Sequence, residues 1–229
     1  NPFSDYLDQA VDLSYEYIGV SDHNPSIANH SEKQIVEIMK RRKEAYEHKY
    51  SSWRKKSNKN VHYFLLCEVD MLPDGKLALP DAAFAYVDGV IASLHSSFTQ
   101  DRKTITKRII TGLTGNPKVR IFGHPTARLL GSREGVDADW QEVFAVCKVQ
   151  DIALEINAGP GRLDLPDTLV YDAVKEKLKF CISTDSHSVE GMDLIRYGVS
   201  VARRGWATKH DILNTLGYNE FRTWLMKGA

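Results

Sequence analysis

Residues 63–70, YFLLCEVD, show the pattern on which the fold of this chain depends. Four consecutive apolar residues are typical of a strand that is buried on both faces, and acidic residues follow this run almost directly. Five other short apolar runs occur along the chain, most of them rich in β-branched or aromatic residues. They comprise residues 17–20, 90–94, 119–122, 152–156 and 180–182. We therefore expect six buried strands.

Signals for helices lie between these runs. Ser31 and Gln34 form a capping box ahead of a long charged segment, which predicts a helix through residue 50. Further helices are expected from residue 101, from 139 through 147, from 166 through 178, from a second capping box at 208–211, and from 219 through 226.

Strands that alternate with helices imply parallel pairing with right-handed crossovers, and hence an α/β barrel or a doubly wound sheet. No glycine-rich loop of the G-x-G-x-x-G or G-x-x-x-x-G-K-S/T type follows any strand. This removes the main nucleotide-binding interpretations of a doubly wound sheet. No repeat or long linker interrupts the sequence, so residues 1–229 are expected to form a single domain.

The composition sets limits on partners and location. Lys plus Arg and Asp plus Glu both total 30, so the zero net charge gives no global attraction to nucleic acid or anionic lipid. No apolar run approaches the roughly 18 residues that span a bilayer, and no signal peptide opens the chain, so we expect no membrane association. The three cysteines lie far apart in apolar stretches, which predicts reduced, buried thiols and a cytoplasmic location.

Residues that commonly bind metals stand at the carboxyl ends of nearly all the expected strands. These ends meet on one open face of an α/β barrel. Four of the eight histidines lie there, against about one expected from random placement. The residues are Asp22, His23, Glu68, Asp70, His95, His124, Asn157, Asp185 and His187.

Imidazole and carboxylate groups together hold zinc, manganese or iron, and a carboxylate can bridge two such ions. Clustered ions lower the pKa of bound water, which makes hydroxide available as a nucleophile, and they neutralise charge that builds on a phosphate. No Ser-His-Asp grouping or nucleophile elbow competes with this interpretation. The sequence therefore predicts metal-dependent phosphoester hydrolysis.

A series of motifs across residues 15–216 resembles one family. The motifs fall at residues 16–23, 68–75, 92–96, 123–130, 155–158, 162–165, 184–187, 196–199 and 202–206. In this order they resemble the PHP (polymerase and histidinol phosphatase) domain, in the version found at the C-terminal end of bacterial and archaeal family X DNA polymerases. The GHPTARLL stretch at 123–130 and ARRGW at 202–206 favour the polymerase version.

The resemblance implies a distorted (β/α)7 TIM-like barrel with up to three zinc, manganese or iron ions. It implies that Glu68 bridges the first and second ions and that His95 and His124 complete the second. It also assigns Asp185 to the first ion, and His23 with His187 to the third. Arg128 and Arg162 are our candidates for binding phosphate, because guanidinium groups match phosphate bidentately.

The chain departs from the family pattern at its start. The family opens with a strand carrying His-x-His, and no His-x-His occurs in this sequence. We therefore expect an N-terminally truncated domain that lacks its first ligand strand, with a polymerase domain upstream. Such a fragment should bind fewer ions and hydrolyse poorly. Asp5 is a weak substitute for one missing ligand.

Several of these residues also have structural interpretations. Asp22 and Asp70 are expected to support ligands or lie on the surface, Asn157 to brace a loop or touch substrate, and the two arginines to form ion pairs. The basic segments 40–43 and 54–59 are interleaved with acidic residues, which favours a solvated helix over a DNA-binding surface.

Four functions remain open on the sequence. The first is a phosphodiesterase domain acting on DNA 3′ ends, as a 3′–5′ exonuclease or in 3′-end processing during repair. The second is a histidinol-phosphatase-like enzyme acting on a small phosphate ester. The third is a non-catalytic barrel that positions DNA, and the fourth, an amidohydrolase, is disfavoured because no strand-end lysine is found.

Overall fold

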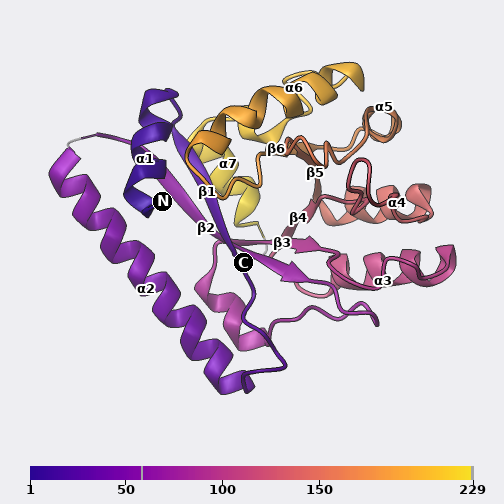
Figure 1. Cartoon of the computed structure of the whole chain (residues 1–229), viewed down its shortest axis with the longest axis horizontal. Helices are drawn as coiled ribbons and strands as arrows, with labels where there is room; N and C mark the ends of the chain where they lie inside the picture. The colour runs from indigo at the N-terminus through magenta and orange to yellow at the C-terminus, as the bar shows by residue number, and fades with distance from the viewer. Residues whose placement is uncertain (58, 228–229) are drawn as a thin grey trace.

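Six parallel strands form one curled sheet in the computed structural model, which describes residues 1–57 and 59–227 (Figure 1). The strands pair in the order in which they occur in the chain. The resulting α/β half-barrel is compatible with a TIM-like barrel. Its strands are β1 (Tyr17–His23), β2 (His62–Asp70), β3 (Gly89–Ser93), β4 (Val119–Gly123), β5 (Ala153–Asn157) and β6 (Phe180–Ser183).

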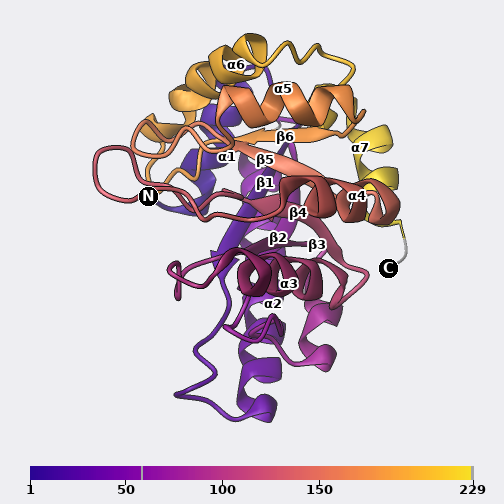
Figure 2. The ribbon, with the colours of Figure 1, turned by 90° about the vertical axis from the view of Figure 1, so that its right-hand side faces the viewer.

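Helices cover the outer face of this sheet. Figure 2 shows α6, α5, α4, α3 and α2 following one another around it. In the main core, Phe122 and Ile156 of the strands pack with Ile109 and Phe144 of the helices. The helices are α2 (Glu32–Ser57), α3 (Arg102–Thr114), α4 (Trp140–Gln150), α5 (Asp167–Lys175) and α6 (Ile195–Arg204), with α1 (Phe3–Asp12) against α2 and 3-10 turns η1 (Asp81–Tyr86), η2 (Glu190–Leu194) and η3 (Leu213–Thr215).

The inner face of the sheet changes character along the strands. Near the amino ends it carries apolar residues, among them Leu66, Ala153 and Cys181, and α7 (Tyr218–Leu225) packs against them through Phe221 and Leu225. A Cβ atom on Gly89 would lie 2.6 Å from the Leu225 side chain, so glycine is required for this close approach. Because inward positions alternate along a strand, the next inward residues are Glu68, Glu155 and Ser183. The apolar residues and α7 therefore form a plug at the amino end of the half-barrel, and the polar end stays open.

The two edges of the sheet differ. On β6, the side chain of Asn214 pairs with the N–H and C=O of Ile182, and the backbone of Asp211 accepts from Phe180. On β1, the described residues supply no neighbouring strand apart from β2. The side of β1 that carries Gly19, Ser21 and His23 is exposed. The sheet is thus open beside β1 within the described part of the chain.

All six expected strands are confirmed, each to within about two residues at its amino end. The carboxyl ends of β1 and β2 extend further than expected, through His23 and Asp70. The capping box of Ser31 and Gln34 and the cap at Asp101 are confirmed by hydrogen bonds. The further strand expected before residue 1 lies outside this chain and stays a prediction.

Some helix predictions were wrong. α2 continues seven residues beyond residue 50, because Trp53 is buried against α1. The hydrogen bonds expected between Thr208 and Asp211 form, but they close a turn and do not begin a helix. The chain is extended at the following residue, Ile212, which forms a parallel β-bridge with Phe180 of β6. α5 ends at Lys175 rather than near residue 178.

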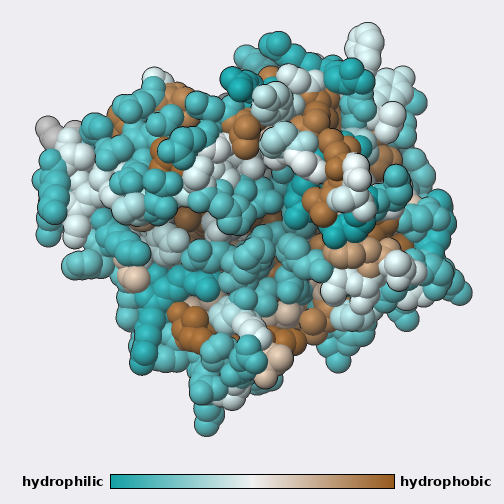
Figure 3. Space-filling model, viewed as in Figure 1, coloured by the Kyte–Doolittle hydropathy of each residue, from teal (hydrophilic) through white to brown (hydrophobic). Residues whose placement is uncertain are grey.

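The surface in Figure 3 is mainly hydrophilic, with apolar side chains in small separate groups. Scattered apolar residues are ordinary on solvent-exposed surfaces, and by themselves they do not mark a binding surface. Among the helices of the described residues, none combines the length and apolar character needed to cross a bilayer.

The plug formed by α7 gives a stability prediction. Leu225→Ala should lower the free energy of unfolding by about 2–5 kcal/mol, because it leaves a cavity against Gly89 and Phe64. Urea unfolding followed by circular dichroism measures the change. Val149→Ala, on the exposed face of α4, is the control and should change the value by less than about 0.5 kcal/mol. Equal effects of the two substitutions would contradict the inward packing of α7.

Candidate metal centre

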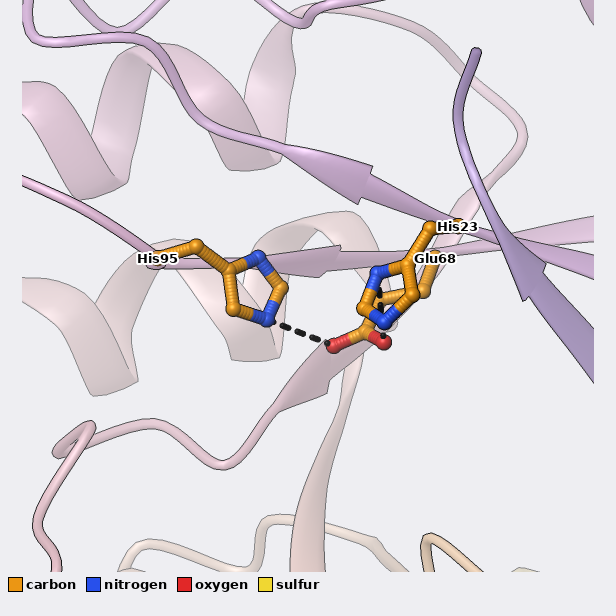
Figure 4. Close-up of side chains that lie close together, drawn as sticks. All are labelled: His23, Glu68 and His95. Atoms are coloured by element: carbon orange, nitrogen blue, oxygen red, sulfur yellow. Dashed lines mark ion pairs between the residues drawn. The ribbon is translucent and has the colours of Figure 1, made fainter. Parts of the chain in front are cut away.

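Glu68 lies at the centre of the polar end of the half-barrel. Its side chain is 12% exposed, and three imidazoles surround its carboxylate. Nε2 of His124 lies 2.9 Å and Nε2 of His95 lies 3.3 Å from Oε1, and Nδ1 of His23 lies 3.4 Å from Oε2. Figure 4 shows the rings of His23 and His95 on either side of the carboxylate.

The parallel register brings these residues together. His23 pairs with Glu68 across β1 and β2, His124 directly follows the last residue of β4, and His95 is the second residue after β3. The ring centroids of His95 lie 5.3 Å from those of His23 and 5.0 Å from those of His124. Ligand atoms of His23, Glu68 and His95 all lie within 4.8 Å of one another, which is a distance that one cation can span.

The loops around this cluster hold an unusual number of left-handed residues. Non-glycine residues with positive φ include His124 and Asp185 in the site, and Ser97, Ala127 and Leu163 in the loops after β3, β4 and β5. Such conformations cost free energy, so surrounding contacts must hold them in place. Their concentration at the carboxyl ends indicates a site whose geometry is fixed by the fold.

Asp70 supports His95 from behind. Its Oδ1 lies 2.6 Å from Nδ1 of His95, which turns Nε2 of the ring toward Glu68. Carboxylates in this position orient metal-binding histidines and increase their basicity. The sequence interpretation of Asp70 as a supporting residue agrees with this contact.

The charges of the cluster depend on each other. Burial alone would lower the pKa of His95, but hydrogen bonds with Asp70 and Glu68 outweigh it and raise this pKa to about 9. Burial acts to raise the pKa of Glu68, yet its hydrogen bonds with His124 and His95 hold that pKa far below the usual range. The hydrogen bonds of the cluster thus favour a charged imidazole beside a charged carboxylate.

Glu155 is a site residue that the sequence analysis missed. It is buried, and it accepts hydrogen bonds from the backbone N–H of His124 and the hydroxyl of Ser183. Burial raises its pKa. A glutamate inside an otherwise apolar strand was the available signal, because such a residue requires polar partners.

Asn157 and Asp185 extend this network. Asn157 is fully buried, and its amide nitrogen lies 3.4 Å from Glu155 and 3.3 Å from Asp185. Its Oδ1 also accepts from the N–H of Gly159, so it braces the loop after β5. Asp185 is thus tied to the Glu155 network through Asn157. His187 is exposed, and its Nδ1 lies 2.9 Å from the carbonyl of Asp185.

The two arginine candidates differ in their surroundings. Arg128 donates from Nε and Nη2 to the carbonyls of Arg162 and Leu163, which holds the loop after β5. Nε of Arg162 lies 3.6 Å from Asp185, and its buried Nη1 has no hydrogen-bond partner among the described residues. Arg162 is therefore the freer group near the cluster.

Two minor candidates lie away from the centre. Asp5 is part of α1 and accepts a hydrogen bond from Ser4. Asp22 meets Arg42 and Tyr46 of α2 on the outer side of β1.

The donor set fits a divalent transition metal. One carboxylate and several imidazoles offer nitrogen and oxygen ligands of the kind that zinc, manganese and iron accept. Nδ1 of His124 is buried without a hydrogen-bond partner among the described residues, so this ring has an unsatisfied polar atom inside the site.

Asp70→Asn should lower the pKa of His95 from about 9, because it removes a negative charge that stabilises the imidazolium. It should also weaken binding of Mn²⁺ or Zn²⁺ about 10- to 100-fold, as loss of an orienting carboxylate does. NMR titration of the histidine rings and calorimetry measure the two effects. Asp12→Asn, at an exposed site on α1, is the control. An unchanged His95 pKa would contradict the orienting role.

Glu68→Gln should weaken metal binding more than Asp70→Asn does, because it removes the anionic ligand itself. His48→Ala, at an exposed position on α2, should leave the affinity unchanged. Metal competition with a chromophoric chelator measures all three variants. If Glu68→Gln bound metal as tightly as His48→Ala, the cluster would not be a metal site.

The comparisons with known proteins relate this chain to one curated protein. It is 33% identical over 219 residues to the DNA polymerase/3′-5′ exonuclease PolX of Bacillus subtilis (strain 168). The match covers 95% of this chain and 37% of that protein, so the chain spans little more than a third of its relative. No family model matches the sequence. The chain is thus similar to this PolX protein over nearly all of its own length.

Proposed function

We propose that this chain is a PHP-type phosphoesterase domain that hydrolyses phosphodiester bonds at DNA 3′ ends with the help of divalent metal ions. The observation that carries the proposal is the half-buried Glu68 carboxylate with three imidazoles at the open end of a parallel half-barrel. The 3′–5′ exonuclease in the name of the PolX relative supports this choice of substrate. A polymerase domain elsewhere in the complete protein is part of the proposal.

The proposed ligands are assigned to different metal ions. Glu68, His95 and His124 would hold one ion, Glu68 and Asp185 would contribute to a second, and His23 with His187 to a third. A bound divalent ion supplies a lowered pKa for water and neutralises charge on the phosphate in the transition state. Asp70 keeps His95 turned toward the ion, and the buried Glu155 network fixes the backbone of His124.

The open edge of β1 supports the expected upstream strand. Gly19, Ser21 and His23 are exposed on a strand whose other edge has no partner among the described residues. Unpaired edges are normally covered or blocked in native proteins. A strand from residues before Asn1, carrying the missing ligands, would cover this edge and place those ligands beside His23. The three free, buried cysteines fit the expected reducing cytoplasm.

Arg162 is the better candidate for holding the scissile phosphate. Its Nη1 is unpartnered beside Asp185, whereas Arg128 already donates to two backbone carbonyls. We therefore assign phosphate binding first to Arg162 and keep Arg128 as the residue that positions its loop.

The full-length natural protein that contains this chain, supplied with Mn²⁺, should shorten a 5′-labelled single-stranded oligonucleotide from its 3′ end. His95→Ala should reduce this rate by about 100-fold or more, since removal of one group that stabilises the transition state costs that much. His48→Ala should digest at the wild-type rate. Gel electrophoresis of the labelled products measures all three.

Two results would sink the proposal. Digestion that survives His95→Ala unchanged would place the activity elsewhere in the protein. Hydrolysis of small phosphomonoesters with none of the oligonucleotide would instead favour a histidinol-phosphatase-like enzyme.

A further inference from the structure

Arg133 links the two loops that follow His95 and His124. Its Nε donates to the carbonyl of Ala127 over 2.7 Å, and its guanidinium carbon lies 3.8 Å from the centre of the Phe98 ring. Phe98 stands three residues after His95, and Ala127 three residues after His124. The N–H of Ala127 donates to the carbonyl of His124 over 2.8 Å, so the guanidinium is held on the turn that begins at this histidine, at the rim of the candidate metal centre.

The loop that carries Arg133 is rigid. The backbones of Leu129 and Arg133 exchange two hydrogen bonds of 2.8 and 2.9 Å, and Gly131 makes the turn with φ of +76°. The N–H of Leu130 donates to the carbonyl of Gly161 in the next loop. A guanidinium stacked on a ring and fixed by such a hairpin is pre-organised, so it loses little entropy on binding.

The charge of Arg133 is poorly compensated. Among the described residues no carboxylate lies within ion-pair distance of it, and its hydrogen bonds use only Nε. Burial, and then repulsion from Arg162, lower the pKa of Arg133, while attraction to Asp164 acts in the opposite direction. Among the described residues the two terminal nitrogens of Arg133 have no hydrogen-bond partner, so they are free for a ligand. Such an arrangement is typical of anion binding.

An exposed apolar side chain completes this rim. Leu130, at the tip of the hairpin, is 48% exposed although it is large and apolar. Its position in the same hairpin as Arg133 suits a ligand that presents both anionic and apolar surface. A nucleotide has this combination, with a charged phosphate and a flat base.

We propose that Arg133, stacked on Phe98, binds the backbone phosphate next to the scissile one, with Leu130 against the adjoining base. This subsite rests on the proposed function, and it deepens it. A small phosphomonoester has one phosphate, which Arg162 and the metal centre can hold alone. A second phosphate-binding group is useful only for a polynucleotide chain.

The test compares two substrates of the full-length protein with Mn²⁺. One is a single-stranded oligodeoxynucleotide, and the other is bis(p-nitrophenyl) phosphate, which has one phosphate only. Arg133→Gln should lower the ratio of kcat/KM for the oligonucleotide to that for the small diester by about 10- to 100-fold, the usual effect of losing one hydrogen bond to a charged group. Arg222→Gln, at an exposed position on α7, is the matched control and should keep the wild-type ratio.

Binding measured in EDTA gives a second readout that a general loss of structure would not mimic. The slope of log K against log salt for the oligonucleotide should become shallower by roughly 0.7 in Arg133→Gln, because one phosphate contact is lost. Arg133→Lys, which keeps the charge but not the planar stack on Phe98, should retain the wild-type slope and lose part of the kcat/KM ratio.

Each outcome decides between the two proposals. Equal losses on both substrates, or no loss on either, would overturn the Arg133 subsite while leaving the phosphoesterase proposal standing. A wild-type protein that hydrolyses neither substrate would remove the phosphoesterase proposal, and the subsite with it.

Discussion

The enclosure of the Glu68 carboxylate among three imidazoles is the interaction on which the rest of this structure depends. A carboxylate moved out of water costs several kcal/mol unless opposite charge and hydrogen bonds replace its hydration. Here His23, His95 and His124 supply that replacement, each from a different strand or from within two residues of its carboxyl end. The register between β1 and β2 must therefore be kept, because a shift of one residue would turn Glu68 to the face of the sheet that the outer helices cover. The same compensation can be given by a cation, which is why the cluster suits a metal.

The inner face of the sheet shows how the fold provides for this charge. Apolar side chains and α7 fill the amino end, so the half-barrel has a packed core below the site. The polar residues above are then held by strands that cannot shift without disturbing that core. Glu155 and Asn157 continue the polar layer across β5, and their buried hydrogen bonds fix the backbone on which His124 and Asp185 depend. The amino-end part of these strands thus carries the packed core, and the carboxyl-end part carries the site.

The sequence predicted the parts of the fold that local patterns determine. Continuous apolar runs identified all six strands, and strand-end His and Glu residues identified the cluster. α6 was missed because few large apolar residues mark its buried side, which consists of Gly198, Val201 and Ala202. Glu155 was missed because its partners Ser183 and the His124 backbone come from other strands. The contact of Arg133 with Phe98 likewise joins two loops that nothing in the local sequence connects.

The balance of charge bears on how such a domain would meet DNA. With equal numbers of acidic and basic residues, the chain has no broad positive field to hold a duplex along its length. Some of the basic side chains of α2 are paired locally, as in the Arg41–Glu37 and Lys43–Glu47 pairs. Arg162 and Arg133 lie in the loops beside the candidate metal centre, and of these two only Arg162 has an ion-pair partner, Asp185, among the described residues. Under the proposed function, attraction concentrated in these loops would suit the capture of a strand end better than the coating of a helix, and it would bring the terminal phosphodiester to the proposed metal ligands.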